Sequence, residues 1–541
     1  MAMTQPTTAV RRDVLGNRLK LHWVWIGFGF FIIGLVIYVG LRSQNYDFNG
    51  FIETIAIEEG GASLFSPNHL VYRPIIAFFY SLMQSAGYVG LSLPIAQVVT
   101  AVSASIGLAL FFWWIRQIVD KPLIAVIATI GFGTSWAYWV FSIDVFYITP
   151  AATAVLAALL ILTNMVKRDD WAVSRVLLLA FFTALGILLW QANIFFVPVV
   201  IGVLAVHHLP NWSRLIQTIL LFVIVMGLLV GGIYLLSSLV VLQDTWSVDA
   251  FLEWILGYGG ASLEIWGQLD ISRVGPAAFS AVSSIVPLWE GMALSELLAG
   301  QFVADKVLPQ LSLLALVLIF AVPAIVFLLR PKSVSIAWRP LLMLAIGYAI
   351  YMPFIIWWDP FEPKWFVVPS IAFWGIAAIL WDTVMPGRWG SLLGLSVLVI
   401  TLANLTAAIL PRSSQPDARL LIADCVAAEM APNDLFIETD WSWSPYLDYF
   451  FERSTVSIIH YAGIFTEEAL LIQLQEDIRA TEAAGGRVYI RDIQTMSEDD
   501  LNWFAEISQF DRAFWTDFRT TPAFTCGDVS VAHLVDVIPP P

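Results

Sequence analysis

Three short polar clusters interrupt an otherwise strongly apolar chain, and they hold the residues that could do chemistry. The first cluster, residues 46–60, contains Asp47 and Glu53. A carboxylate such as Asp47 can act as a general base toward a hydroxyl that lies within hydrogen-bond reach. An Asp directly before an apolar-periodic segment is equally typical of a helix N-cap. Residue type and spacing leave both interpretations of Asp47 open.

The stretch at residues 65–74 follows the first cluster and carries His69, Tyr72 and Arg73. A guanidinium matches phosphate oxygens with two parallel hydrogen bonds, so Arg73 and His69 could hold a phosphate or a sugar. An isolated Arg at a membrane interface is more often an anchor whose charged end reaches water. Both interpretations stay open here too.

The second cluster reads WVFSIDVFYITP at residues 139–150 and contains Asp144. Asp144 is predicted to open the following helix, where a carboxylate suits the helix dipole, and a capping role competes with a chemical one.

The third cluster reads WWDPFEPKWF at residues 357–366, and its polar members are Asp359, Glu362 and Lys364, next to Trp358. A lone cation beside aromatic rings can receive a lipid phosphate while the rings stack on sugar or isoprene. An aromatic belt with a local ion pair is the competing interpretation.

The rest of the chain must position these clusters, and its composition predicts a membrane protein. Of the 541 residues, 59% are hydrophobic, 24 are Trp, and the mean hydropathy is +0.78. A soluble globular protein does not need that much apolar surface, whereas a bilayer takes about 20 apolar residues per helix. We expect about eleven transmembrane helices. They fall near residues 22–41, 92–115, 122–140, 145–165, 174–190, 193–207, 215–240, 308–330, 340–358, 365–382 and 389–410.

The loop at residues 42–91 is predicted to hold two amphipathic helices in the plane of the interface. The first has an apolar stripe that leaves Glu53 and Thr54 on its polar side; the second could instead be a true span. The stripe residues are Phe48, Phe51, Ile52 and Ile55 in the first helix, and Tyr72, Ile75, Ile76 and Phe79 in the second.

The distribution of Lys and Arg predicts the orientation. With the N-terminus in the cytoplasm, the inner loops receive 14 basic residues and the outer loops five. All three polar clusters then lie outside, and an odd number of spans places the C-terminal domain outside as well. We expect a multi-pass protein of the plasma (inner) membrane of a bacterium.

The chain is predicted to divide into a transmembrane domain, residues 1–410, and an extracytoplasmic α/β domain, residues 411–541. The second domain has 22 acidic and 8 basic residues. Its strand-like runs are residues 434–438, 454–459, 487–492 and 529–538, and a helix at 467–484 ends at Gly485-Gly486. This helix lies between the second and third runs, and strand–helix–strand order predicts parallel pairing.

Several partners and cofactors can be judged from the same residues. Cys425 and Cys526 could pair in an oxidising compartment, and two unpaired thiols are equally compatible with the sequence. The chain has no glycine-rich phosphate loop, which argues against a nucleotide site, and no basic face for nucleic acid.

These features together resemble the GT-C fold glycosyltransferases that use polyprenyl-phosphate sugars, a group that includes protein O-mannosyltransferases and lipid A aminoarabinose transferases. The similar features are an Asp just after the first span, an amphipathic helix pair with a Pro/His-Tyr element, the acid in SIDVFYITP, and an α/β domain after the last span. The family has Glu and a nearby Tyr where this chain has Asp144 and a shifted Tyr147.

The resemblance implies a function and roles for the residues. The protein would move a sugar, with inversion, from a polyprenyl-phosphate donor to a hydroxyl of an acceptor lipid, glycan or protein. Asp47 would be the base, and Arg73 or Lys364 would neutralise the phosphate. Asp144, His69 and Glu362 would orient the substrates, with Glu53, Tyr72, Trp358 and Asp359 completing the binding set. A divalent metal held by Asp47, His69 and Asp144 is possible in this fold.

Two other function classes compete with this hypothesis. A transporter would need polar residues or broken helices at mid-bilayer depth in two related halves, and the polar groups here instead gather at one interface. A non-catalytic membrane assembly protein would need no such residues and is not tested by the sequence.

Overall fold

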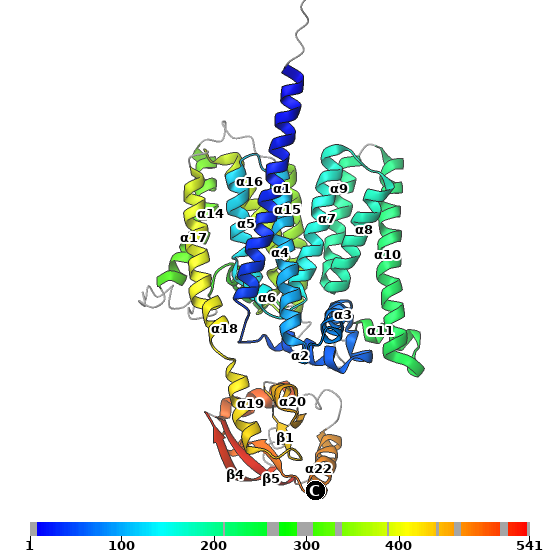
Figure 1. The fold of residues 1–541 in the computed structure, drawn as a ribbon, viewed down its shortest axis with the longest axis vertical. Helices are drawn as coiled ribbons and strands as arrows, with labels where there is room; N and C mark the ends of the chain where they lie inside the picture. The colour runs from blue at the N-terminus through cyan, green and yellow to red at the C-terminus, as the bar shows by residue number, and fades with distance from the viewer. Residues whose placement is uncertain are drawn as a thin grey trace, which may run out of the picture. The chain divides into compact units, whose positions relative to one another are not determined.

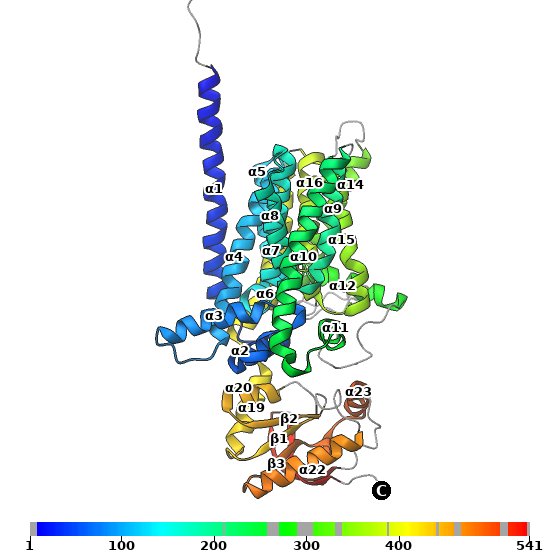
Figure 2. The ribbon, with the colours of Figure 1, turned by 90° about the vertical axis from the view of Figure 1, so that its right-hand side faces the viewer.

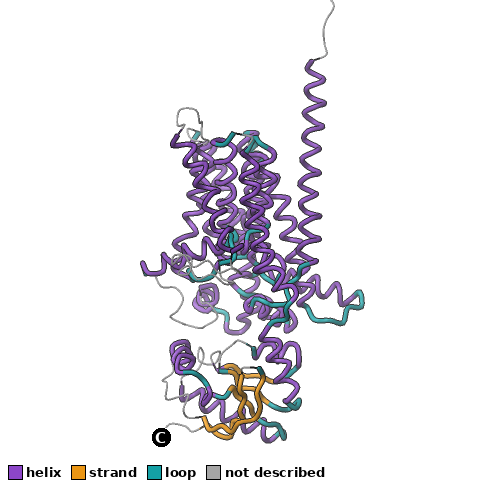
Figure 3. The backbone as a smooth tube through the Cα atoms, turned by 90° about the vertical axis from the view of Figure 1, so that its left-hand side faces the viewer, coloured by secondary structure: helices purple, strands orange, loops and turns teal. Residues whose placement is uncertain are grey.

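The computed structural model describes residues 8–537 except 209–210, 257–269, 289–306, 330–337, 387–388, 440–442, 459–466, 509–517 and 528. The chain forms two compact units. The first unit comprises Met1–Ser43, Asn49–Trp246 and Leu269–Ser413, and the second comprises Gln44–Phe48, Ser247–Gln268 and Ser414–Pro541. The first unit is helical, and the described strands lie in the second (Figure 3).

Long apolar helices dominate the first unit (Figure 1). Among the described residues, eight helices are long and apolar enough to cross a membrane, or nine if the bent pair α5 and α6 is one span. Two further apolar helices, α8 and α16, are shorter. The prediction of a multi-pass membrane protein is confirmed, and the number of eleven spans stays a prediction. The helices up to the end of this unit are α1 (Thr8–Gly40), α2 (Phe48–Glu59), α3 (Tyr72–Ser85), α4 (Leu93–Ile118), α5 (Pro122–Gly133), α6 (Trp136–Ile143), α7 (Ile148–Arg168), α8 (Val173–Leu189), α9 (Phe196–His208), α10 (Trp212–Leu242), α12 (Val274–Ser283), α14 (Val307–Leu329), α15 (Trp338–Trp358), α16 (Pro369–Val384), α17 (Gly390–Asn404) and α18 (Leu410–Ser414).

The span predicted at 122–140 contains a bend, because α5 and α6 meet at an angle of 59°. A break at membrane depth frees backbone groups that must find partners inside the protein. Here the Trp136 N–H donates to the carbonyl of Ile285, and the Asn404 side chain donates to the carbonyls of Thr134 and Ile285. Residues from the later part of the chain thus supply the hydrogen-bond partners for the backbone groups at the break.

The two helices of the first loop are present, and neither is among the candidate spans. The second predicted helix, α3, buries Tyr72 and Ile76 and leaves other apolar side chains exposed, as expected for a helix at an interface. The exposed apolar side chains are Phe78, Phe79, Leu82 and Met83.

The buried face of α2 differs from the predicted stripe. Glu53 and Thr54, expected on the polar side, are both buried, whereas Ile52 and Ile55 are only half-buried. The periodicity of apolar residues misplaces this face because Glu53 is paired inside the protein, and a paired charge can be buried.

The second unit contains a five-stranded sheet in the order β2-β1-β3-β5-β4. Strand β1 pairs in parallel with both neighbours, with Leu435 opposite Ser454 and Val488, while β5 runs antiparallel to β3 and β4. The helix predicted before Gly485 is present, and Gly485 has a φ of +79°, which favours glycine. The elements are α11 (Val248–Leu256), α19 (Ala418–Glu429), β1 (Leu435–Glu438), α20 (Ser444–Phe451), β2 (Ser454–Ser457), α22 (Glu467–Ala483), β3 (Val488–Arg491), α23 (Glu498–Ser508), β4 (Phe518–Cys526) and β5 (Val529–Val537).

Strand β4 was not predicted from the sequence. It carries Pro522 next to a register irregularity, and an edge strand tolerates a proline that a central strand does not. A disulfide joins Cys425 of α19 to Cys526 of β4, so the cysteines pair. The bond fixes the helix that begins this domain to the edge of its sheet.

Candidate functional site

Parts of the predicted polar clusters, without Asp47, meet within the first unit, at the end of the helical bundle where α2, α3 and α6 lie (Figures 1 and 2). Contacts run from the first loop through the turn after α6 to the short turn Pro363–Phe366 before α16. The three clusters are far apart in sequence, so the fold is what brings them together.

Glu53 is the centre of the first part of the site. Its carboxylate accepts hydrogen bonds from Arg73 at 2.8 Å from Nε and 3.2 Å from Nη2. His69 Nε2 lies 2.8 Å from the same carboxylate. Burial raises the pKa of Glu53, but the charges of His69 and Arg73 outweigh burial and lower that pKa to about 2. Glu53 is therefore ionised at neutral pH, and its carboxylate is hydrogen-bonded to the guanidinium of Arg73.

A stack of aromatic rings connects the first loop to the second cluster. The ring of His69 stacks on Tyr147 with centroids 4.2 Å apart, and Tyr147 stacks on Phe146 at 4.6 Å. Tyr72 meets Tyr147 edge-on and shares a hydrogen bond with Thr100 of α4. Burial raises the pKa of Tyr72 well above its usual value, so its phenol stays protonated. The predicted residues His69 and Tyr72 are thus both in contact with the turn after α6.

Asp144 does not open the next helix as predicted. It caps the C-terminus of α6, and α7 begins only at Ile148. Asp144 is buried, and its carboxylate accepts a hydrogen bond from the Val145 N–H at 2.7 Å. Gly50 of α2 lies directly against the carbonyl of Val145. Asp144 therefore sits in an extended turn that α2 covers.

Lys364 is a buried cation at the other end of this stack. Its side chain is only 4% exposed, and its ammonium lies 5.7 Å from the ring of Phe146 and 5.1 Å from the ring of Trp365. Glu362, which is 45% exposed, lies 3.5 Å from the ammonium. The surroundings of Lys364 thus include two aromatic rings and a half-exposed carboxylate.

The remaining residues of the third cluster hold the turn itself. Asp359 accepts hydrogen bonds from the Phe361 N–H and the Trp365 indole, and Trp358 stacks on Phe354 with parallel rings. These contacts are typical of a local structural role, and substrate binding by Trp358 and Asp359 stays a prediction.

Arg273 is a further candidate for the site, and residue type and spacing alone did not point to it. It is buried at the start of α12, and its guanidinium donates to the Trp358 carbonyl at 3.1 Å. It was one of five basic residues in the predicted outer loops. That scarcity was the available signal, because buried cations are rare without a purpose.

Asp47 belongs to the second compact unit, together with the rest of the Gln44–Phe48 segment. Within that unit the segment is bound by Asp417, which accepts a hydrogen bond from the Tyr46 N–H and donates its own N–H to the Gln44 carbonyl. The role of Asp47 as a base stays a prediction.

The resemblance raised the possibility of a divalent metal held by Asp47, His69 and Asp144. Among the residues that the structure describes, no group of three or more His, Cys, Asp or Glu side chains is arranged to hold a metal ion. These residues do not fit a metal, and we derive no step through one.

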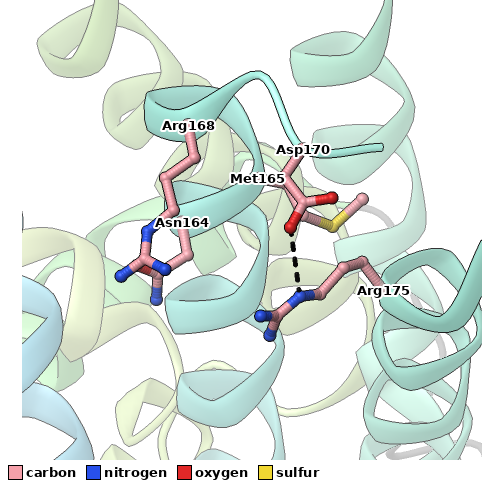
Figure 4. Close-up of a pocket in the computed structure, with 5 residues that line it drawn as sticks. All are labelled: Asn164, Met165, Arg168, Asp170 and Arg175. Carbon is pink, nitrogen blue, oxygen red and sulfur yellow. Dashed lines mark ion pairs between the residues drawn. The ribbon is translucent and has the colours of Figure 1, made fainter. Parts of the chain in front are cut away.

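A cavity of about 170 Å³ lies at the C-terminal end of α7 (Figure 4). Asp170 and Arg175 face each other across it at 3.5 Å, and Arg168 and Asn164 complete its polar lining. Because α7 has 21 residues, this cavity is about 30 Å from Tyr147 at the other end of the helix. It is not part of the site.

Comparisons with known proteins place the fold. No protein-family model matches the chain, and no curated protein matches it by sequence. Among solved structures, ArnT from Cupriavidus metallidurans in the apo state is similar with a TM-score of 0.58 and 13% identity, over 95% of this chain and 98% of that one. The crystal structure of ArnT bound to undecaprenyl phosphate gives a TM-score of 0.57 at the same identity and coverage. ArnT is a glycosyltransferase of the GT-C class, and this chain has the GT-C fold.

Proposed function

We propose that the protein is a membrane glycosyltransferase that moves a sugar from a polyprenyl-phosphate donor to an acceptor hydroxyl. The observation that carries the proposal is the meeting of buried cations, carboxylates and stacked rings at one end of a GT-C helical unit. A similar structure, that of ArnT, was solved with undecaprenyl phosphate bound, which supports a polyprenyl-linked donor here.

In the proposed reaction, the acceptor hydroxyl attacks the anomeric carbon from the face opposite the phosphate, so the configuration inverts. The bond between the anomeric carbon and the phosphate oxygen breaks, and polyprenyl phosphate leaves with the electron pair. Asp47 takes the hydroxyl proton as general base, a role worth about 10²–10⁴ in rate.

Of the two predicted phosphate ligands, the contacts favour Lys364 over Arg73. The guanidinium of Arg73 is occupied by Glu53 through two hydrogen bonds and by the Ser63 carbonyl through a third. The ammonium of Lys364 lies buried beside the rings of Phe146 and Trp365, with the half-exposed carboxylate of Glu362 at 3.5 Å. A fixed cation in such surroundings stabilises the charge that develops on a leaving phosphate. Arg273, buried beside Trp358, is a second candidate for this task.

The remaining roles follow from the contacts of each residue. In the proposal, Glu53 and His69 keep the first loop in place and present Tyr147, and Asp144 and Glu362 orient acceptor or sugar.

We further propose that the site faces the extracytoplasmic side of the plasma membrane, with the N-terminus in the cytoplasm. The excess of Lys and Arg in the opposite loops supports this orientation. The disulfide in the C-terminal domain also supports it, because disulfides persist in oxidising compartments.

The direct test is sugar transfer by purified protein from a panel of polyprenyl-phosphate sugars, with wild type beside Asp47→Asn. Transfer by wild type, and a loss of about 10²–10⁴ in Asp47→Asn with donor binding retained, would support both the class and the base. Asp170→Asn, at the opposite end of α7, is the matched control and should keep full activity.

Full transfer by Asp47→Asn would contradict the assigned base and move it to Asp144. No transfer from any donor, with acceptors varied, would contradict the class and favour a transporter or an assembly protein.

A further inference from the structure

The Gln44–Phe48 segment, which carries Asp47, is held by a buried carboxylate of the C-terminal domain. Asp417 is 1% exposed, and it makes two backbone contacts with this segment. Its N–H donates to the Gln44 carbonyl at 2.9 Å, and its Oδ2 accepts from the Tyr46 N–H at 3.0 Å. This pair of hydrogen bonds fixes the backbone one residue before Asp47.

The same carboxylate is itself anchored in the C-terminal domain. Its Oδ2 accepts from the Tyr446 hydroxyl at 2.8 Å, and its Oδ1 accepts from the Arg419 N–H at 2.9 Å as the N-cap of α19. Asp417 therefore connects the Tyr46 backbone to two helices of the domain, α19 and α20, with both oxygens used.

The side chains on either side of Asp47 also contact the C-terminal domain. The ring of Tyr46 stacks on Phe450 with centroids 6.3 Å apart, and the guanidinium of Arg419 lies 6.0 Å from the ring of Phe48. Both neighbours of Asp47 in the chain are thus held by the same domain.

We propose that the C-terminal domain is a positioning element for the reaction and that Asp417 is its positioning residue. The inference rests on the proposed function, with Asp47 as the base. A general base works only within hydrogen-bond reach of the proton that it takes, and a displacement of about 1 Å can cost about 10²-fold in rate. By this inference the domain fixes the backbone of the segment that carries Asp47.

The test is Asp417→Asn in the full chain. Asn is as good an N-cap as Asp, so the cap of α19 can survive. When the Asn oxygen caps the helix, its NH2 group faces the Tyr46 N–H. Both are donors, so that hydrogen bond is lost. Asp434→Asn is the matched control, because Asp434 is also buried and accepts from two backbone N–H groups, those of Ala431 and Arg487.

Two measurements are made on both variants: amide hydrogen exchange of a peptide covering the Gln44–Phe48 segment, and kcat and KM for sugar transfer. We expect Asp417→Asn to speed exchange at Tyr46 by about tenfold or more and to lower kcat by about 10- to 100-fold, with the KM for donor nearly unchanged. Asp434→Asn should leave both quantities near those of wild type. If Asp417→Asn does not fold, Tyr46→Ala removes the stack on Phe450 without changing the domain, and a drop in kcat is expected there too.

Unchanged exchange at Tyr46, or faster exchange with unchanged kcat, would overturn the inference. So would equal losses in Asp417→Asn and Asp434→Asn, which would indicate general destabilisation. If the wild type transfers no sugar at all, the proposed function fails, and the exchange measurement still decides whether Asp417 holds the segment.

Discussion

Gly50 of α2 packs against the main-chain carbonyl of Val145, and no methyl group fits between them. The contact places the first loop directly against the turn that carries Asp144. Gly50→Ala would have to push α2 away from the backbone of the turn. Gly50 lies in a helix, where the backbone conformation does not require glycine. Glycine is needed here because the backbone of α2 approaches the Val145 carbonyl so closely.

We therefore expect Gly50→Ala to lower transfer activity by about tenfold or more, because a small shift of a positioned group is costly in rate. Steady-state kinetics and thermal unfolding of the purified protein would measure the effect. Gly227→Ala in α10 is the control, because nothing lies within 4 Å of a Cβ built there. Equal activity of the two variants would contradict the assigned role of this contact.

The buried carboxylate of Glu53, paired with His69 and Arg73, should make stability depend on acid pH. Its contacts with His69 and Arg73 lower the pKa of Glu53 to about 2, from an ordinary value of 4.5, so these contacts stabilise the fold above pH 4.5 and lose this contribution as pH falls toward 2. The shift corresponds to about 3 kcal/mol at neutral pH. Glu53→Gln should therefore unfold at a lower temperature than wild type at pH 7, and the gap should shrink below pH 4.5.

Glu59→Gln is the control for this prediction, because Glu59 is exposed at the end of the same helix. It should unfold close to wild type at every pH. A gap between Glu53→Gln and wild type that stays constant down to pH 3 would show that charge pairing is not what stabilises this site.

Lys364→Met removes a buried charge while keeping a similar side-chain length. If the ammonium stabilises the leaving phosphate, kcat should fall by about 10²–10³, as for other fixed groups that stabilise developing charge. Binding of polyprenyl phosphate, measured by its inhibition of transfer, should also weaken. Arg168→Met, at the far end of α7, is the control for loss of a positive charge. Wild-type kinetics in Lys364→Met would contradict this role of Lys364 and favour Arg273 as the residue that stabilises the phosphate.

The disulfide between Cys425 and Cys526 closes a loop with a sequence separation of 101 residues. Replacing both with Ser should destabilise the C-terminal domain by about 2–5 kcal/mol. Reducing agent should produce the same loss in wild type and none in the double variant. Thiol labelling after acid quenching and denaturation of cells reports on sidedness as well, because a cytoplasmic domain would contain two free thiols where an extracytoplasmic one contains the disulfide.

Much of the fold could be predicted from the sequence because membrane spans need long apolar segments, which are visible without any partner. The face of α2 could not be predicted in the same way. Glu53 is buried because Arg73, twenty positions later, pairs with it, and no local periodicity contains that information. The edge strand β4 could not be predicted for a related reason: Pro522 is tolerated because, among the described strands, β4 is the last one in the sheet.

The candidate site could also be predicted only in part. The clusters around Asp144 and Lys364 could be picked out because charged residues are rare in this part of the chain. Their meeting through Tyr147 and Phe146 depends on helix packing, which residue types alone do not specify. Arg273 was visible as a scarce outer cation, yet only its burial beside Trp358 distinguishes it from an interfacial anchor.

The break between α5 and α6 has a consequence for how the protein is made. Its backbone groups are satisfied by Ile285 and Asn404, which the ribosome adds about 150 and 270 residues after the break itself. When α5 and α6 first enter the bilayer, these partners do not yet exist, and a straight helix is the only form that satisfies its own backbone. We therefore expect the bend to form after insertion, once α12 and α17 have been synthesised. The turn at Asp144 follows α6 directly, so the site is completed late in biogenesis, when nearly the whole membrane unit is in place.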